Sequence, residues 1–294
     1  FDYFGSAVAL SGLVAIVGAP NEDEDATGGN SLESAGAAYA FVDVGTNWLE
    51  AQKLVASDRD GSANFGRSVA ISGTTIVVGA PNDNQDANGG NALTNAGSAY
   101  MFEPGSPFWQ QTAKLVASDR SGSDNFGHSV AVSGTTVVVG AYNDDDDASG
   151  GNPLNQAGSA YVLEKLNGTW QQTQKLAAAD RGLFDKFGHA VAVSGTTAVV
   201  GAPDDDQDAN GANALSNAGS AYVFGTCNTL GTPILSGVPL CVGQALTLTM
   251  PATCASGLTA QLSDAGGSFA SPVGLGSVQT GQNQVVIPSG TPPG

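Results

Sequence analysis

The chain repeats itself every 61 residues, and this period limits the possible folds more than any other feature of the sequence. Four copies without net insertion or deletion between their landmarks indicate one structural unit stacked four times. The copies begin near residues 4, 65, 126 and 187. The landmarks on this interval are the Phe-Gly pairs at Phe4, Phe65, Phe126 and Phe187, the tryptophans Trp48, Trp109 and Trp170, and the tyrosines Tyr39, Tyr100, Tyr161 and Tyr222.

Each copy has the pattern of four short strands. In the second copy we expect strands at residues 67–72, 74–80, 97–103 and 109–117. The unbroken apolar run Ile76-Val77-Val78 predicts a strand that is buried on both faces. No segment keeps a helical apolar period. Antiparallel units of this length predict an all-β, propeller-like array of four four-stranded repeats, with the tryptophans packed between blades.

Composition and repetition exclude several classes of protein. The chain has 27 acidic against 9 basic residues and a net charge of −18, so its surface repels the phosphates of nucleic acids. No stretch approaches the ~20 apolar residues of a membrane span. An enzyme needs one asymmetric cluster of reactive groups, whereas the polar residues of interest here recur in several copies. We therefore expect a protein that is not an enzyme, with no nucleic-acid partner and no membrane span.

The landmarks together resemble a known repeat. Phe-Gly, Val-Val-Gly-Ala-Pro, an acidic loop and Gly-Ser-Ala-Tyr-Val-Phe follow one another in each copy, with small variations. This order is similar to that of the FG-GAP repeat, which occurs in the head of integrin α-subunits and in many secreted bacterial proteins. The resemblance covers residues 1–225 and implies a β-propeller. The family usually builds seven blades, of which this region holds four.

An acidic loop lies between the second and third strand of each copy, at residues 21–25, 82–86, 143–147 and 204–208. These loops hold 14 of the 27 acidic residues. Carboxylates this close raise each other's pKa unless a cation neutralises them. Ca²⁺ takes six to eight oxygen ligands, and the loops contain no histidine or cysteine that would favour zinc. The sequence therefore predicts bound calcium, and the alternative is a set of solvated Asp- and Asn-rich turns.

The candidate calcium ligands are oxygen-bearing side chains at alternate loop positions. FG-GAP loops bind calcium through Asp-x-Asp-x-Asp-Gly-x-x-Asp, but here alanine stands at the sixth position and glycine or alanine at the ninth. An asparagine at the tenth position is the candidate distal ligand. The second loop has only two acids, so we expect it to bind most weakly. The candidates at positions one, three, five and ten are Asn21, Asp23, Asp25 and Asn30; Asn82, Asn84, Asp86 and Asn91; Asn143, Asp145, Asp147 and Asn152; and Asp204, Asp206, Asp208 and Asn213.

Two other features look functional but are expected to be structural. The pairs Asp58-Arg59, Asp119-Arg120 and Asp180-Arg181 recur before each Phe-Gly, which indicates turn formation and local ion pairing. His128 and His189 occupy one repeat position, where Ser6 and Arg67 stand in the other copies. We interpret these histidines as surface variants on neighbouring blades.

The C-terminal segment has a different composition. Residues 226–294 contain no lysine or arginine, one acid, and all three cysteines. We expect a linker at 226–240 and a partial module at 241–294, with strands at 245–250, 258–263 and 284–287. The stretch 259–264, with Ser268-Phe269 and Ile287-Pro288, resembles immunoglobulin-like modules of bacterial surface proteins, which implies a partial β-sandwich. Cys241 and Cys254 flank one strand and are the preferred disulfide pair, with Cys227 free or paired elsewhere.

These features predict a calcium-binding extracellular protein that acts in adhesion or in a surface structure. The first copy has no Trp strand before its Phe-Gly, and Gly231 stands where the fourth copy would need its tryptophan. Either the sequence is part of a longer protein, or neighbouring copies supply strands and build a head-to-tail filament. The expected partners are other copies of the chain, other surface proteins or a glycan. The alternatives are a monomeric propeller that binds a sugar or a protein, and third a propeller enzyme.

Overall fold

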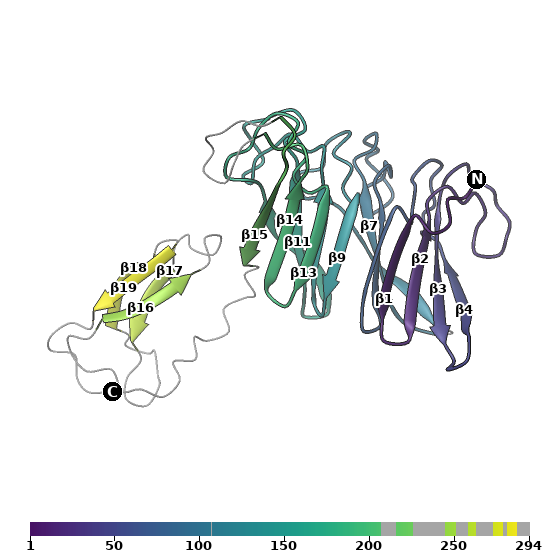
Figure 1. Ribbon diagram of the computed structural model, residues 1–294, viewed down its shortest axis with the longest axis horizontal. Coiled ribbons are helices and arrows are strands. Elements are labelled where there is room, and N and C mark those ends of the chain that lie inside the picture. Colours follow the sequence, from purple (N-terminus) through teal and green to yellow (C-terminus); the bar gives the residue numbers. More distant parts are fainter. Residues whose placement is uncertain are drawn as a thin grey trace. The chain divides into compact units, whose positions relative to one another are not determined.

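The structure of the chain is a computed structural model that describes residues 1–106, 108–206 and 216–225 and four further strands between residues 245 and 286. The chain divides into two compact units, Phe1–Val223 and Phe224–Gly294. The described residues contain no helix. Figure 1 shows the strands of both units.

The first unit consists of antiparallel sheets, one for each copy, in which every strand pairs with the next along the chain. The second sheet begins and ends each strand within about two residues of the limits expected from the sequence, so the prediction of four-stranded copies is confirmed. The described part of the fourth sheet has three strands. The sheets are β1 (Ala7–Ser11), β2 (Val14–Ala19), β3 (Ala37–Asp43) and β4 (Trp48–Leu54); β5 (Ser68–Ser72), β6 (Thr75–Ala80), β7 (Ser98–Pro104) and β8 (Trp109–Leu115); β9 (Ser129–Ser133), β10 (Thr136–Ala141), β11 (Ser159–Leu166) and β12 (Thr169–Leu176); and β13 (Ala190–Ser194), β14 (Thr197–Ala202) and β15 (Ser220–Gly225).

Each complete sheet carries an irregularity at the same place. The register between the third and fourth strands shifts at Ala40/Phe41, Met101/Phe102 and Val162/Leu163. A bulge at this position bends the strand and increases the local twist. The outer strands of the three sheets therefore leave the plane of their sheets in the same way.

Neighbouring sheets pack face to face. We call the side of a sheet that faces the preceding repeat its upstream face, and the opposite side its downstream face. Val77 and Val78 lie on opposite faces of β6, and both are 0% exposed, which confirms the predicted burial on both faces. Trp109 packs between repeats as predicted. In the first interface, the downstream residues Ile16, Ala38, Ala40 and Leu54 pack against the upstream residues Phe65, Val69, Tyr100 and Trp109.

The Phe-Gly pair is the point of closest approach between repeats. The backbone N–H of Phe65 donates to the carbonyl of Ala35 at 3.0 Å, and Gly36 and Phe65 form a parallel bridge. A Cβ atom on Gly18 would overlap the carbonyl oxygen of Gly66. Gly66 has a φ of +92°, which favours glycine. The recurring glycines of both motifs are thus explained by backbone contact across the interface.

The second unit contains two separate antiparallel pairs of strands. β16 (Ala245–Met250) pairs with β19 (Gly281–Val286), and β17 (Leu258–Leu262) pairs with β18 (Val273–Val278). β16 has the bounds expected from the sequence, whereas β18 was not predicted. The expected linker at 226–240 and the cysteines Cys227, Cys241 and Cys254 lie outside the described residues.

Candidate functional site

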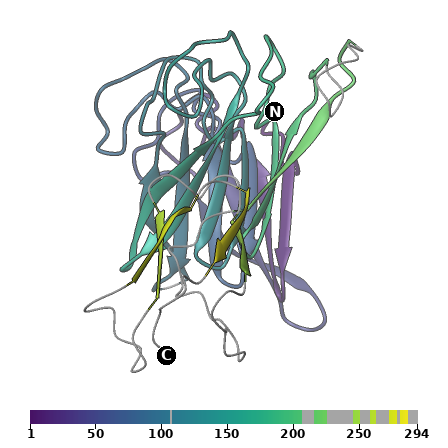
Figure 2. The same cartoon turned by 90° about the vertical axis from the view of Figure 1, so that its left-hand side faces the viewer.

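The acidic loops lie together at one edge of the first unit. In an antiparallel meander every second connection leaves the sheet at the same end, so the β2–β3, β6–β7 and β10–β11 loops share an edge, which is uppermost in Figures 1 and 2. The structure describes the first three loops completely. In the fourth loop it describes Asp204 and Asp206, while Asp208 and Asn213 lie outside the described residues.

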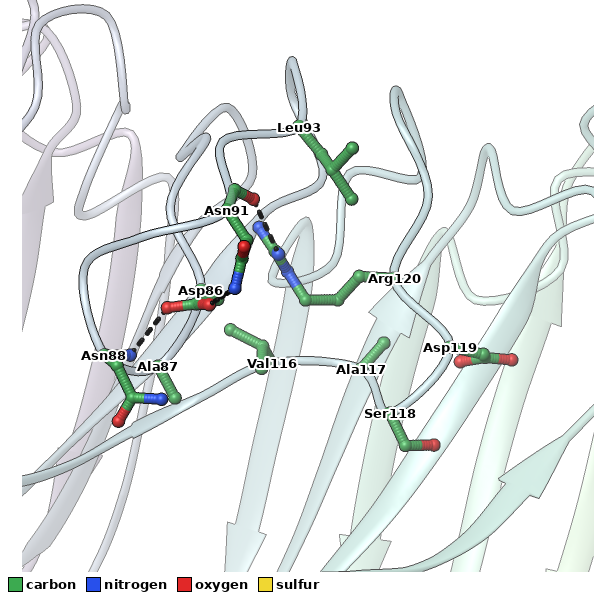
Figure 3. A pocket seen from close by; sticks show the side chains of 10 residues that line it. All are labelled: Asp86, Ala87, Asn88, Asn91, Leu93, Val116, Ala117, Ser118, Asp119 and Arg120. Atoms are coloured by element: carbon green, nitrogen blue, oxygen red, sulfur yellow. Dashed lines mark hydrogen bonds between the residues drawn. The ribbon is translucent and has the colours of Figure 1, made fainter.

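The fifth and tenth positions of each described loop contact each other directly. In the second loop, the side-chain amide of Asn91 donates to Asp86 at 2.5 Å (Figure 3). The N–H of Gly90 donates to the same carboxylate at 3.0 Å. Asn30 with Asp25 and Asn152 with Asp147 repeat this pair. The donors, Gly90 first and then Asn91, lower the pKa of Asp86. The expectation that crowding raises the pKa of these carboxylates is therefore wrong at the fifth position.

The third and first positions have different partners. At the third position, Asp145 accepts the backbone N–H of Gln156 at 2.7 Å across the loop, and Asp23, Asn84 and Asp206 accept equivalent bonds. The first position contacts the Phe-Gly junction instead, since the amide of Asn143 donates to Asn125 at 2.7 Å. In the fourth copy an ion pair of 2.6 Å between Asp204 and Lys186 replaces this contact.

The recurring Asp-Arg pairs connect three successive repeats. Arg120 donates to the carbonyl of Asn91 in the preceding acidic loop at 3.3 Å (Figure 3). It also donates to the carbonyl of Asn84 in that loop at 2.9 Å. Asp119 points the other way and pairs with Lys175 of the following repeat at 2.7 Å. These contacts fit a structural role, but they differ from the local ion pairing expected from the sequence, because Asp119 pairs with a lysine and Arg120 with main-chain carbonyls of another repeat. Arg59 and Arg181 bind the loops before them in the same way.

The second position of each loop is the functional feature that the sequence analysis missed. Asp83 is 1% exposed and accepts the hydroxyl of Tyr100 at 2.6 Å. Lys114 lies between Asp83 and Asp58, at 2.8 and 2.6 Å. Burial and the charge of Asp83 raise the pKa of Tyr100. The signal was available in the sequence, because Lys53, Lys114 and Lys175 follow the 61-residue interval together with the tyrosines.

The residues of each loop fit calcium in part. Arg120 contacts the main chain of the third and tenth residues, and the tenth side chain contacts the fifth, so these three positions lie close together. They offer only oxygen and amide groups, which suit a hard cation. The first-position residues Asn82 and Asn143 are held at the repeat junction and do not fit. Among the described residues, no group of three or more histidines, cysteines or acids is arranged as metal ligands.

A shallow hollow of about 550 Å³ lies beside the second loop (Figure 3). Asp86, Asn91 and Arg120 contribute polar groups to its wall, and Leu93 and Val116 contribute apolar ones. The hollow is where the acidic loop of one repeat meets the junction that leads to the next. The wall of the hollow therefore contains both candidate calcium ligands and residues of the junction between repeats.

His128 and His189, interpreted from the sequence as surface variants on neighbouring blades, form a cluster of rings in which His189 is exposed and His128 is half-buried. Their ring centroids are 4.9 Å apart, and Tyr142 lies 4.2 Å from His128 and 5.7 Å from His189. Burial lowers the pKa of His128 to about 4, with smaller effects from the charges of Arg67 and His189. The innermost strands β9 and β13 are neighbours, which brings these residues together although they are 61 positions apart.

The fold and the repeated loops define an all-β protein with a propeller-like array of stacked repeats. The FG-GAP repeat family matches residues 1–41, 48–102, 109–163 and 170–224, which is more than half of the chain. The chain belongs to this family, as its motifs predict, and such repeats are typical of extracellular proteins. A comparison with curated proteins gave no match. Within the described residues, no helix has the length and apolar character needed to cross a membrane.

Proposed function

We propose that the chain is a non-enzymatic extracellular protein, structural or adhesive, whose acidic loops bind calcium. The observation that carries this proposal is the grouping of the third, fifth and tenth loop positions in three successive repeats. In the third repeat these are Asp145, Asp147 and Asn152. FG-GAP repeats work where calcium is millimolar, so even weak sites would be occupied.

Calcium would supply charge neutralisation at the edge of the array. The fifth-position carboxylate and the tenth-position amide would turn their oxygens toward the ion, which requires a flip of the amide of Asn152 relative to its contact with Asp147. Arg181 already binds the main chain of the same loop from the next repeat. A loop stiffened by calcium would therefore also stiffen the junction between repeats.

Calorimetric titration of the full chain with CaCl₂ tests this proposal. The decisive variant is Asp147→Asn, and the matched control is Asp146→Asn, which removes the same charge from the same loop at a position without a candidate role. We expect Asp147→Asn to lose one calcium equivalent and Asp146→Asn to keep it. No heat with calcium, or equal losses in both variants, would count against the calcium site.

The polar residues that recur are occupied in contacts between repeats, which supports a structural function over catalysis. Asp58 and Lys114 are ion-paired at 2.6 Å, and Arg59 is bound to the preceding loop. The proposed partners are other copies of the chain or other surface proteins. Strand pairing with a neighbour at β15, the edge of the described fourth sheet, is one route to a filament. We further propose a partial Ig-like module at 241–294 with a Cys241–Cys254 disulfide.

The ring cluster of His128, Tyr142 and His189 favours a second candidate function, the binding of a sugar or a protein group. Arg67, at the same repeat position as the histidines, adds a positive charge. Histidine NMR spectra of the chain titrated with glucose, galactose and glucuronate test this candidate. Saturable shifts of both histidines would support it. Spectra that stay unchanged with all three would leave the cluster without a ligand of this class.

A further inference from the structure

We propose that the downstream face of the fourth repeat binds the upstream face of the first repeat in a second copy of this chain. The inference rests on the structural part of the proposed function and names the partner and the surface. It does not depend on calcium. The argument comes from the internal interfaces, where the same two faces meet in every case.

The described downstream face of the fourth repeat carries apolar side chains that are more exposed than their counterparts in the other repeats. Val77 and Val138 occupy this face in the second and third repeats and are 0% exposed, whereas the corresponding Val199 is 38% exposed. Val162 is 1% exposed on β11, and its counterpart Val223 on β15 is 71% exposed. The side chains that elsewhere touch the next repeat therefore face outward here.

The upstream face of the first repeat shows the complementary pattern. The Phe-Gly phenylalanines Phe65, Phe126 and Phe187 are 0% exposed, whereas Phe4 is 57% exposed. The first and fourth strands of the two repeats show the same contrast in exposed fraction. Val69 is 9% exposed against 71% for Val8, and Trp109 is 7% exposed against 47% for Trp48.

The fourth repeat also has a hollow where the others receive a Phe-Gly backbone. This hollow measures about 480 Å³ and is lined by Ala190, residues 201–203 and residues 218–221. In the first repeat the equivalent glycines, Gly18 and Gly36, are covered by the backbone of Gly66 and Phe65. Within the part of the chain that the structure describes, the counterparts in the fourth repeat have other neighbours, Ala190 beside Gly201 and Pro203 beside Gly219, and no Phe-Gly backbone.

Among the Phe-Gly pairs of the described residues, Phe4-Gly5 is the exposed one, because Phe65, Phe126 and Phe187 are buried in the internal interfaces. Leu248 stands one interval after Phe187. The innermost strands are neighbours in the order β1, β5, β9, β13, so β1 and β13 lie at opposite ends of the first unit (Figure 1). The Phe4 of the same chain therefore does not reach the hollow, and a second copy supplies it. Because the two faces differ, the contact is head to tail.

Two substitutions remove one face each. In the single chain, a Cβ on Gly201 would meet only Ala190, at 3.7 and 3.8 Å, so Gly201→Ala leaves the fold intact. In the assembled state this Cβ would overlap the docked backbone, as it would at Gly18 against Gly66. Phe4→Ala removes the aromatic anchor from the other face. We expect each variant to weaken self-association by roughly 30-fold or more.

Sedimentation velocity of the full chain over a concentration series measures the association. Phe108→Ala is the matched control, since Phe108 is 47% exposed and lies on neither end face. The sharpest test mixes Gly201→Ala with Phe4→Ala. Each variant keeps one intact face, so the mixture should form one-to-one dimers and nothing longer, while the double variant should remain monomeric.

The same series with a chelator separates this inference from the calcium proposal. Association that persists without calcium, and that both variants weaken, supports the head-to-tail contact even if the loops bind no metal. A wild-type chain that is monomeric at about 100 µM would overturn the inference. So would a mixture that forms no dimer, or association that Phe108→Ala weakens as much as Phe4→Ala.

Discussion

Gly18→Ala and Gly201→Ala place the same methyl group at the same repeat position, and only the first should destabilise the protein. The built Cβ on Gly18 lies 3.5 Å from Ala7, and that on Gly201 lies 3.7 Å from Ala190, so the environments within the repeat are matched. Neither glycine has a positive φ, so backbone strain is not involved. The difference is the backbone of Gly66, whose carbonyl carbon would lie 3.1 Å from the new methyl group of Gly18 and whose carbonyl oxygen would be overlapped.

The size of the effect follows from this overlap. The first two repeats must separate by about 1 Å, and a gap of that size forfeits up to about half of the local dispersion energy. Overpacking costs about 1–3 kcal/mol, and loosening the bond from Phe65 to Ala35 adds about 1 kcal/mol. We expect Gly18→Ala to lower the free energy of unfolding by about 2–4 kcal/mol. Gly201→Ala should leave it unchanged or raise it by up to about 1 kcal/mol.

Urea unfolding at low protein concentration measures this difference, with tryptophan fluorescence as the signal. Trp48, Trp109 and Trp170 lie on β4, β8 and β12 and report on the first three repeats. If the free energy of unfolding depends equally steeply on urea concentration in both variants, the shift in midpoint reflects a change in stability. If both variants shift the midpoint equally, backbone contact across the interface is not the reason for glycine at this position.

Three further substitutions test the buried charges. Lys114→Met should cost about 3–5 kcal/mol at pH 7, because it leaves Asp58 and Asp83 together without their cation; the urea midpoint at pH 7 measures this. Burial, with the charge of Asp144, raises the pKa of Asp124 to about 7. The folded chain therefore holds a proton on Asp124 that the unfolded chain loses near pH 4. This group makes the free energy of unfolding fall as pH rises from 4 to 7. Across this range the free energy of unfolding of Asp124→Asn should fall less than that of the wild type, and at pH 8 it should be higher by up to about 4 kcal/mol. Glu164 is 2% exposed and its two carboxylate oxygens have no hydrogen-bond partner among the described residues, so Glu164→Gln should raise the melting temperature at pH 7 and have little effect at pH 4.

The repeats themselves could be predicted from the sequence because their signals are local. Ile76-Val77-Val78 is apolar without interruption, and the turn between β5 and β6 follows from Ser-Gly-Thr-Thr at 72–75. Both features depend on neighbours in the chain, so period and turn chemistry were sufficient. The tryptophan positions were also predictable, since a large aromatic side chain on the interval needs a place between repeats.

The contacts between repeats were harder to predict because they join residues far apart in the sequence, 43 positions for Asn82 and Asn125 and 56 for Lys114 and Asp58. Nothing local marks Asn82 as a partner of Asn125 or Lys114 as a partner of Asp58, and the sequence analysis assigned Asn82 to a metal site. The fourth copy shows how a contact of shorter range, 18 positions apart in the third copy, could have been found from the sequence. Asp204 and Lys186 replace two asparagines together, and this compensated exchange within one chain marks a direct contact.

Stability in a stacked array comes from each repeat and from each interface between neighbours. An internal repeat such as the second has two interfaces, whereas the first and fourth each have one within the described chain. Phe4 and Val223, on the two end faces of the described repeats, are 57% and 71% exposed. Head-to-tail docking would give both end repeats the second interface that the internal repeats already have. The exposed end faces therefore make assembly possible and also leave the end repeats less stable than the internal ones. We expect assembly to raise the stability of the folded end repeats.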